Sequence, residues 1–156
     1  MTNSATDRRI VVGVDGSESS RHALRWAIDQ AALTGATVDA VNAWELPTYA
    51  GMAPVVDTGD EAEALSKAGE QMLAETLTAV SGDHPTVAIR SRVVQGHAAF
   101  ELLRAAEGAD LLVLGCRGHG GFIGVLLGSV SQYCVYHANC PVVVVRGAYC
   151  AGDGGT

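Results

Sequence analysis

Short apolar runs alternate along this chain with longer segments in which apolar residues recur every three or four positions. The first run, residues 9–14, is apolar almost throughout, which is typical of a strand covered on both faces. The next segment has the apolar spacing of an amphipathic helix. Ser17 is suited to cap that helix, and Gly35 is suited to end it.

The same alternation continues to the end of the chain. Asp60 with Glu63, and Ser129 with Gln132, have the spacing of capping boxes, so we expect a helix to begin at each pair. A shorter helix is expected after Gly96. The remaining strands are predicted at residues 37–44, 87–93, 110–115 and 141–145.

Every connection between predicted strands contains a helix, which predicts a parallel sheet with right-handed crossovers. The expected fold is therefore an α/β three-layer sandwich with helices on both faces of a five-stranded sheet. We expect one domain over residues 8–147, with flexible tails at 1–7 and 148–156. If the first and fourth strands end at one ligand, they are neighbours and the strand order is 3-2-1-4-5.

Composition narrows the classes of partner. The 156 residues carry a net charge of −7 and a single lysine, Lys67, which disfavours nucleic acid as a partner. No apolar run is long enough to cross a bilayer, so no membrane partner is expected. The polar start at residues 1–9 does not resemble a signal peptide, and a cytoplasmic location is the expectation. The four cysteines lack metal-binding spacing and are interpreted as buried or incidental thiols.

A glycine-rich loop follows the fourth predicted strand and leads into the helix expected at Ser129. Such a turn lets backbone N–H groups approach a phosphate, and the helix N-terminus adds partial positive charge. The loop has one cation, Arg117, and lacks the Gly-Lys-Ser/Thr ending of a Walker A loop. Ile123 stands where a dinucleotide fingerprint needs its third glycine. A flexible surface loop without a ligand remains the alternative, and Arg117 could equally be a solvated cation.

Asp15 directly follows the first predicted strand and has two interpretations. It could contact a ligand at the strand end, or it could only form the turn before the first helix. Ser129 likewise could contact a phosphate, cap its helix, or do both. His119 has no paired acid or nucleophile that the sequence suggests, so no catalytic residue is assigned.

Taken together, these motifs resemble the universal stress protein family from Ile10 to Arg146, and in particular its ATP-binding branch. The long spacing between the loop glycines and the following serine is the most specific signal. The matching segments are residues 11–17, residues 110–115, the Gly115-x-x-Gly118-x9-Gly128-Ser129 pattern with Val130 and Ser131, and residues 138–145.

The resemblance implies the strand order 3-2-1-4-5, ATP with Mg²⁺ at the C-terminal edge of the sheet, and a homodimer joined through the strand Val142–Val145. It implies that Asp15 contacts the ribose and helps to hold a phosphate-bound Mg²⁺. Cys116 departs from the family, which has serine or threonine there, and this puts a hydroxyl contact in doubt. The cofactor-binding residues that it implies are Gly13, Val14, Asp15, Ala43, Gly115, Arg117, Gly118, Gly128, Ser129, Val130 and Ser131.

Three functions stay open at this point. The first is an ATP-binding stress-response regulatory protein, in which nucleotide orders the connection at residues 45–59 and changes binding of an unknown regulatory partner. The second is a slow ATP hydrolase, which would be at most a weak ATPase because few charged groups are available to clamp a phosphoryl group. The third is a nucleotide-independent dimeric scaffold. The glycine loop favours the first.

Overall fold

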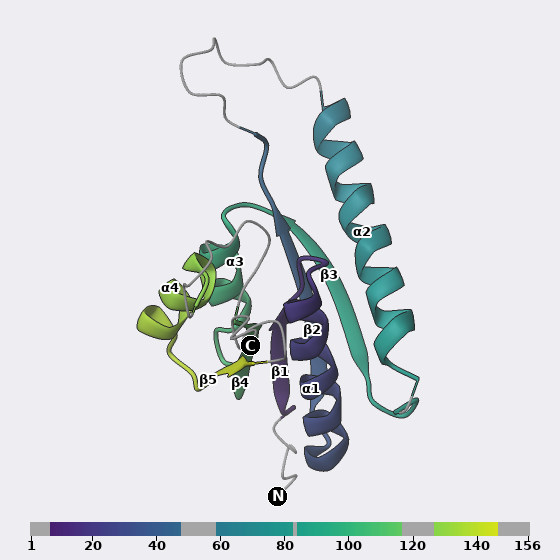
Figure 1. The fold of residues 1–156 in the computed structure, drawn as a ribbon, viewed down its shortest axis with the longest axis vertical. Helices are drawn as coiled ribbons and strands as arrows, with labels where there is room; N and C mark the ends of the chain where they lie inside the picture. Colours follow the sequence, from purple (N-terminus) through teal and green to yellow (C-terminus); the bar gives the residue numbers. More distant parts are fainter. Residues whose placement is uncertain (1–6, 48–58, 83, 117–126, 147–156) are drawn as a thin grey trace, which may run out of the picture.

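The computed structural model describes residues 7–47, 59–82, 84–116 and 127–146. The predicted tails therefore lie, apart from Asp7, outside the described residues. Within the described ranges, strands and helices alternate in the predicted order (Figure 1). The elements are β1 (Arg9–Gly13), α1 (Glu18–Thr34), β2 (Thr37–Trp44), α2 (Asp60–Val80), β3 (Ile89–Gln95), α3 (Ala98–Ala105), β4 (Leu111–Gly115), α4 (Ser129–His137) and β5 (Val142–Val145).

The strands form one parallel sheet in the order β3-β2-β1-β4-β5, which confirms the predicted topology. The central strand β1 pairs with both β2 and β4, so that Ile10 lies opposite Val38 on one side and Leu111 on the other. β3 and β5 form the two edges of this sheet.

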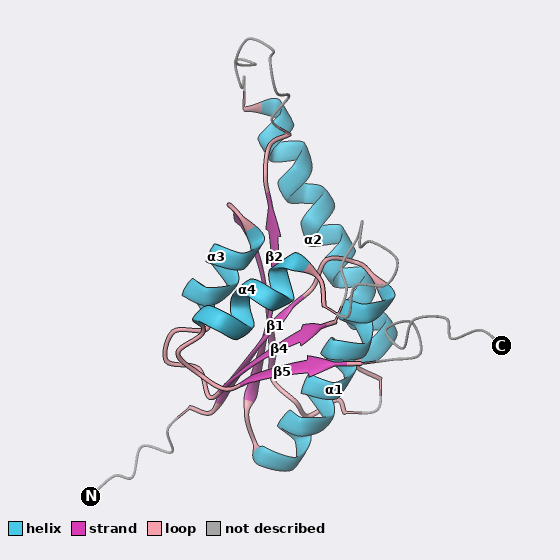
Figure 2. Ribbon diagram, turned by 60° about the vertical axis from the view of Figure 1, so that its left-hand side comes forward, coloured by secondary structure: helices cyan, strands magenta, loops and turns pink. Residues whose placement is uncertain are grey.

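Helices cover both faces of the sheet, as predicted. In Figures 1 and 2, α1 and α2 lie on one face, and α3 and α4 lie on the other. Adjacent residues of β1 serve the two faces: Val12 packs with Leu24 and Leu73, whereas Val11 packs with Leu102. Both valines are fully buried. Because side chains alternate along a strand, burial on both faces requires the continuous apolar run seen in the sequence.

The two ends of α1 agree with the sequence. The Ser17 side chain accepts a hydrogen bond from the Ser20 backbone N–H, as expected of an N-cap. Gly35 ends the helix in the left-handed conformation, with φ of 76°, and its N–H donates to the Ala31 carbonyl. This conformation favours glycine because it has no Cβ.

The two predicted capping boxes do not form, although both helices begin at the predicted residues, Asp60 and Ser129. Gly59 and Gly128 are the N-cap residues of α2 and α4, and neither has a side chain that could cap its helix. Asp60 and Ser129 are already helical. A capping box needs its first residue just outside the helix, so both sequence patterns lie one position too late.

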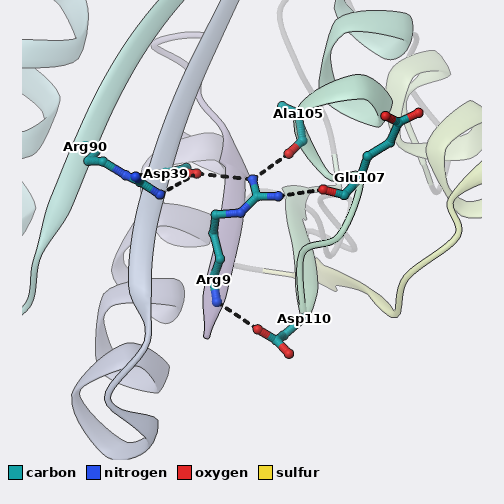
Figure 3. Close-up of polar contacts among 6 residues, drawn as sticks. All are labelled: Arg9, Asp39, Arg90, Ala105, Glu107 and Asp110. Carbon is teal, nitrogen blue, oxygen red and sulfur yellow. Dashed lines mark hydrogen bonds and ion pairs between the residues drawn. The ribbon is translucent and has the colours of Figure 1, made fainter. Parts of the chain in front are cut away.

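A network of charged side chains lies at the end of the sheet where β1, β2 and β3 begin (Figure 3). The Arg9 guanidinium lies 3.2 Å from the Asp39 carboxylate. Arg90 from the neighbouring strand contacts the same carboxylate at 2.7 Å. The Asp39 side chain is only 13% exposed, so two arginines compensate one largely buried charge.

Arg9 also attaches the sheet to the end of α3. Its guanidinium donates to the backbone carbonyls of Ala105 and Glu107, each at 2.6 Å (Figure 3). Its backbone N–H donates to the Asp110 carboxylate at 2.8 Å. One arginine therefore satisfies carbonyls at a helix C-terminus that have no partner within the helix.

We expect Arg9→Met to lower the free energy of unfolding by about 2–3 kcal/mol. The substitution keeps most of the side-chain length but removes the charged hydrogen-bond donors from their partly buried acceptors. Denaturant unfolding would measure the loss. Arg21→Met is the control, because Arg21 forms an exposed pair with Glu18 at 3.2 Å, and such pairs contribute about 0–1 kcal/mol. Equal losses in the two variants would contradict a special role for Arg9.

Candidate functional site

Three of the predicted binding segments meet at the carboxyl edge of the sheet. Gly13 is the last residue of β1, Gly115 is the last residue of β4, and Ala43 is the penultimate residue of β2. These strands are parallel and adjacent in the order β2-β1-β4, so their carboxyl ends lie side by side. In open α/β sheets, this edge is where ligands bind.

Asp15 forms the turn between β1 and α1. Its carboxylate accepts hydrogen bonds from the Ser17 backbone N–H at 2.9 Å and from the Ser17 hydroxyl at 2.5 Å. Gly16 has φ of 84°, which completes the turn. The turn-forming interpretation of Asp15 is therefore correct. It does not exclude a ligand, because an exposed carboxylate has further acceptor positions.

Val14 is held in the sheet through its backbone. Its N–H donates to the Val41 carbonyl at 2.9 Å, and its carbonyl accepts from the Asn42 side-chain amide at 2.9 Å. Its side chain is 2% exposed and belongs to the core beneath α1. The N–H of Val14 is therefore already paired, and only its carbonyl could accept a further hydrogen bond.

Packing constrains two of the predicted glycines. A Cβ on Gly13 would lie 2.9 Å from side-chain carbons of both Leu102 and Leu114. A Cβ on Gly115 would lie 2.7 Å from the Ser19 carbonyl carbon and oxygen. These contacts show that β1 approaches α3 closely and that β4 ends against the first turn of α1. The segments that carry Asp15 and the start of the glycine loop therefore lie together.

The two ends of the glycine loop are joined. The Gly128 N–H donates to the Cys116 carbonyl at 2.7 Å. The Ser131 hydroxyl donates to the Gly115 carbonyl at 2.7 Å, and Ser131 is 5% exposed. The Ser131 hydroxyl thus ties α4 to the end of β4, and only its backbone remains suited to a ligand. Cys116 is fully buried beside the Ser19 hydroxyl, so its side chain packs inward.

The first turn of α4 presents backbone donors after a glycine N-cap, Gly128, which has no side chain to cap them. Ser129 is exposed and Val130 is half-buried, and both lie directly after Gly128. The first N–H groups of a helix have no carbonyl partner within it. Together with the helix dipole, such groups favour an anion. The remaining predicted contacts, Arg117 and Gly118, lie outside the described residues.

The described residues contain no group of three or more His, Cys, Asp or Glu side chains arranged to hold a metal ion. The predicted metal contact there is the single carboxylate of Asp15. In the same described part of the chain, no helix combines the length and the apolar character needed to span a membrane.

The thiol of α4 belongs to the core rather than to the site. Cys134 is fully buried, and its thiol lies 3.8 Å from the Ala99 carbonyl of α3. Burial raises the pKa of Cys134 to about 11, so the thiol stays protonated at neutral pH. The interpretation of this cysteine as a buried thiol is confirmed.

Asn42 is a residue of this edge that the sequence patterns did not identify. It is 8% exposed and lies within β2, next to Ala43. The available signal was an amide inside a strand whose neighbours are apolar, since buried polar side chains need partners. Its partner, the Val14 carbonyl, lies on another strand and could not be read from local sequence.

Residues 7–146 match the model of the universal stress protein family. A universal stress protein of Mycolicibacterium smegmatis is 36% identical over 141 residues, which cover 88% of this chain and 45% of that protein. The chain therefore spans about half the length of the curated relatives that it matches.

Solved structures of universal stress proteins also match this chain. The universal stress protein UspA from Lactobacillus plantarum has a TM-score of 0.78 at 23% identity, covering 90% of this chain and 98% of that one, which shows the shared fold. A universal stress protein solved in complex with cAMP has a TM-score of 0.67 at 28% identity, covering 88% of this chain and 96% of that one. On the match over nearly all of its length, this chain belongs to the universal stress protein family.

Proposed function

We propose that this protein binds ATP at the carboxyl edge of its sheet, and that the bound nucleotide controls its conformation or its interaction with a regulatory partner during a stress response. The observation that carries the proposal is the N-terminus of α4, which begins after a glycine N-cap, Gly128, and is tied to the end of β4 beside the Asp15 turn. Backbone donors in this position suit phosphate oxygens. The cAMP complex of a relative supports an adenine nucleotide as the ligand.

The nucleoside and the phosphates would be recognised by different strands. Gly13, Val14 and Ala43 would line the adenine, and Asp15 would contact the ribose. The amides of Ser129, Val130 and Ser131 would face the phosphates, together with Gly118 and Arg117 of the loop. The strand order supports this division, because β1 and β2 supply one side of the edge, whereas β4 and α4 supply the other.

Asp15 fits a site for nucleotide-bound Mg²⁺. Magnesium ions in nucleotide sites are commonly bound by one or two carboxylates, phosphate oxygens and waters, so a full set of protein ligands is not required. The ion would neutralise phosphate charge. Asp15 would in addition keep its turn, because the hydrogen bonds from Ser17 reach one carboxylate oxygen and an ionised carboxylate can accept several hydrogen bonds.

A homodimer through β5 is part of the proposal. This strand is an edge of the sheet, and all four of its valines are only half-buried. Val143 and Val145 pack beneath α1, and Val142 packs on the other face, whereas Val144 belongs to neither core. An apolar edge strand is a template for pairing with another chain. The second copy would supply that pairing.

A cytoplasmic location stays a prediction.

We expect Asp15→Asn to weaken ATP binding about tenfold in the presence of Mg²⁺ and to abolish the effect of Mg²⁺ on affinity. The asparagine oxygen can still accept from Ser17, so the turn should persist while the charge is lost. Calorimetric titration with and without Mg²⁺ measures both effects. Asp29→Asn, which removes the same charge from α1, is the control. An unchanged Mg²⁺ dependence in Asp15→Asn would remove Asp15 from the site.

We expect Val144→Glu to convert a dimer to a monomer, because it places a charge on the proposed interface without opening either core. Light scattering after size exclusion would measure the mass. Val135→Glu, on α4, is the control because Val135 is 47% exposed. A Val144→Glu protein that remains dimeric, with an unchanged unfolding midpoint, would rule out β5 as the interface.

We expect the protein to release labelled phosphate from γ-labelled ATP at a rate below a few turnovers per minute. The described residues around the edge offer one carboxylate and backbone donors but no evident group that would orient a water for attack. Faster release would favour the alternative of an ATP hydrolase. A wild-type protein that binds no adenine nucleotide would favour the scaffold.

A further inference from the structure

One buried side chain connects the strand ends that carry the proposed nucleoside contacts. The Asn42 amide of β2 donates to the Val14 carbonyl at 2.9 Å. Val14 in turn donates from its N–H to the Val41 carbonyl at 2.9 Å. The end of β1 is thus fixed to β2 on both sides of Val14. Asp15 follows directly, and Ala43 follows Asn42, so this bond joins the ribose side of the proposed site to the adenine side.

The position of the Asn42 amide is set from α2. A Cβ on Gly69 would lie 2.7 Å from the Asn42 side-chain oxygen and 3.0 Å from a Val93 methyl carbon. Gly69 is buried in α2, which lies along β2 and β3 in Figure 1. The missing side chain at Gly69 therefore makes room for the amide. Since Asn42 is only 8% exposed, the amide has little space in which to turn.

This arrangement also leaves one acceptor without a partner among the described residues. No described N–H or O–H group donates to the side-chain oxygen of Asn42, which faces the backbone of α2. The amide is therefore held by a single hydrogen bond and by contact with Gly69. A shift of α2 would press on the amide or release it, and would act on the Val14 carbonyl through Asn42.

We propose that Asn42 is a positioning residue for the nucleoside half of the site, and that α2 acts on nucleotide binding through Gly69. This inference rests on the proposed function and deepens it, because it identifies the part of the fold through which the site is regulated. The mechanism is local: Asn42 holds Val14, Val14 sets the Asp15 turn, and the packing of Gly69 decides whether Asn42 can reach its partner.

The test compares Asn42→Ala and Gly69→Ala in the full chain. The first removes the amide, and the second keeps it but displaces it with a methyl group. Both should weaken AMP binding about tenfold in a calorimetric titration, because both leave the Val14 carbonyl unpaired and the turn misplaced. AMP is the probe because most of its contacts would fall on the nucleoside side.

Amide hydrogen exchange of the ligand-free protein provides a readout that general destabilisation would not reproduce. We expect exchange in residues 14–17 to accelerate in both variants while the rest of the sheet stays protected. Thr76→Ala is the matched control: Thr76 is a polar residue of the same helix, 2% exposed, and its hydroxyl donates only within α2, to the Met72 carbonyl at 2.8 Å and toward the Met72 sulfur at 3.6 Å. It should lose stability without selective exchange at the turn.

The outcomes separate the two proposals. If the wild type binds AMP and both variants bind it equally well, with unchanged exchange at residues 14–17, the role of Asn42 is refuted and the proposed function stands. If Thr76→Ala also weakens AMP binding and accelerates exchange at residues 14–17, a general loss of packing explains both effects, and the positioning role of Asn42 is refuted. If the wild type binds neither AMP nor ATP, the proposed function fails, and the role of Asn42 in nucleotide binding fails with it.

Discussion

The parallel pairing of β1 with β4 is the constraint on which the rest of this structure depends. Val11 and Val12 of β1 lie opposite Leu112 and Val113 of β4, and all four are fully buried. Segments a hundred residues apart in the chain are thereby aligned with the same polarity. Their carboxyl ends must then lie next to each other. The candidate site follows from this pairing, because the Asp15 turn leaves one strand and the glycine loop leaves the other.

Close approach between layers shapes this edge as much as the strand order does. Because these glycines have no side chain, Gly13 can pack against α3 and Gly115 against the first turn of α1. Gly69 likewise leaves space for the Asn42 amide. A methyl group at any of these positions would meet a neighbour at less than 3.0 Å. Interiors are packed too densely to absorb such an overlap without a shift. Glycines that look like ligand-binding residues in the sequence can therefore be present for packing.

Several side chains at the edge combine a structural role with the proposed one. Asp15 forms its turn through Ser17, and Ser131 uses its hydroxyl to tie α4 to β4. Among the described residues, the backbone N–H groups at the start of α4 and the Asp15 carboxylate are the groups that the proposed nucleotide site would use. Because the chain spans about half of its curated relatives, the activity of those longer proteins does not transfer to it directly.

The sequence by itself determined the order of elements, the parallel sheet, the cap at Ser17 and the end of α1 at Gly35, because these depend on local periodicity and on backbone conformation near each residue. It also predicted that α2 and α4 begin at Asp60 and Ser129, but it assigned side-chain caps to these two residues, whereas the N-cap positions are Gly59 and Gly128. Only the tertiary structure decided that Arg9 joins β1, β2 and α3, and that Asn42 holds Val14. These contacts join residues on different strands and helices, and no pattern within a single segment encodes a partner that the fold alone brings near.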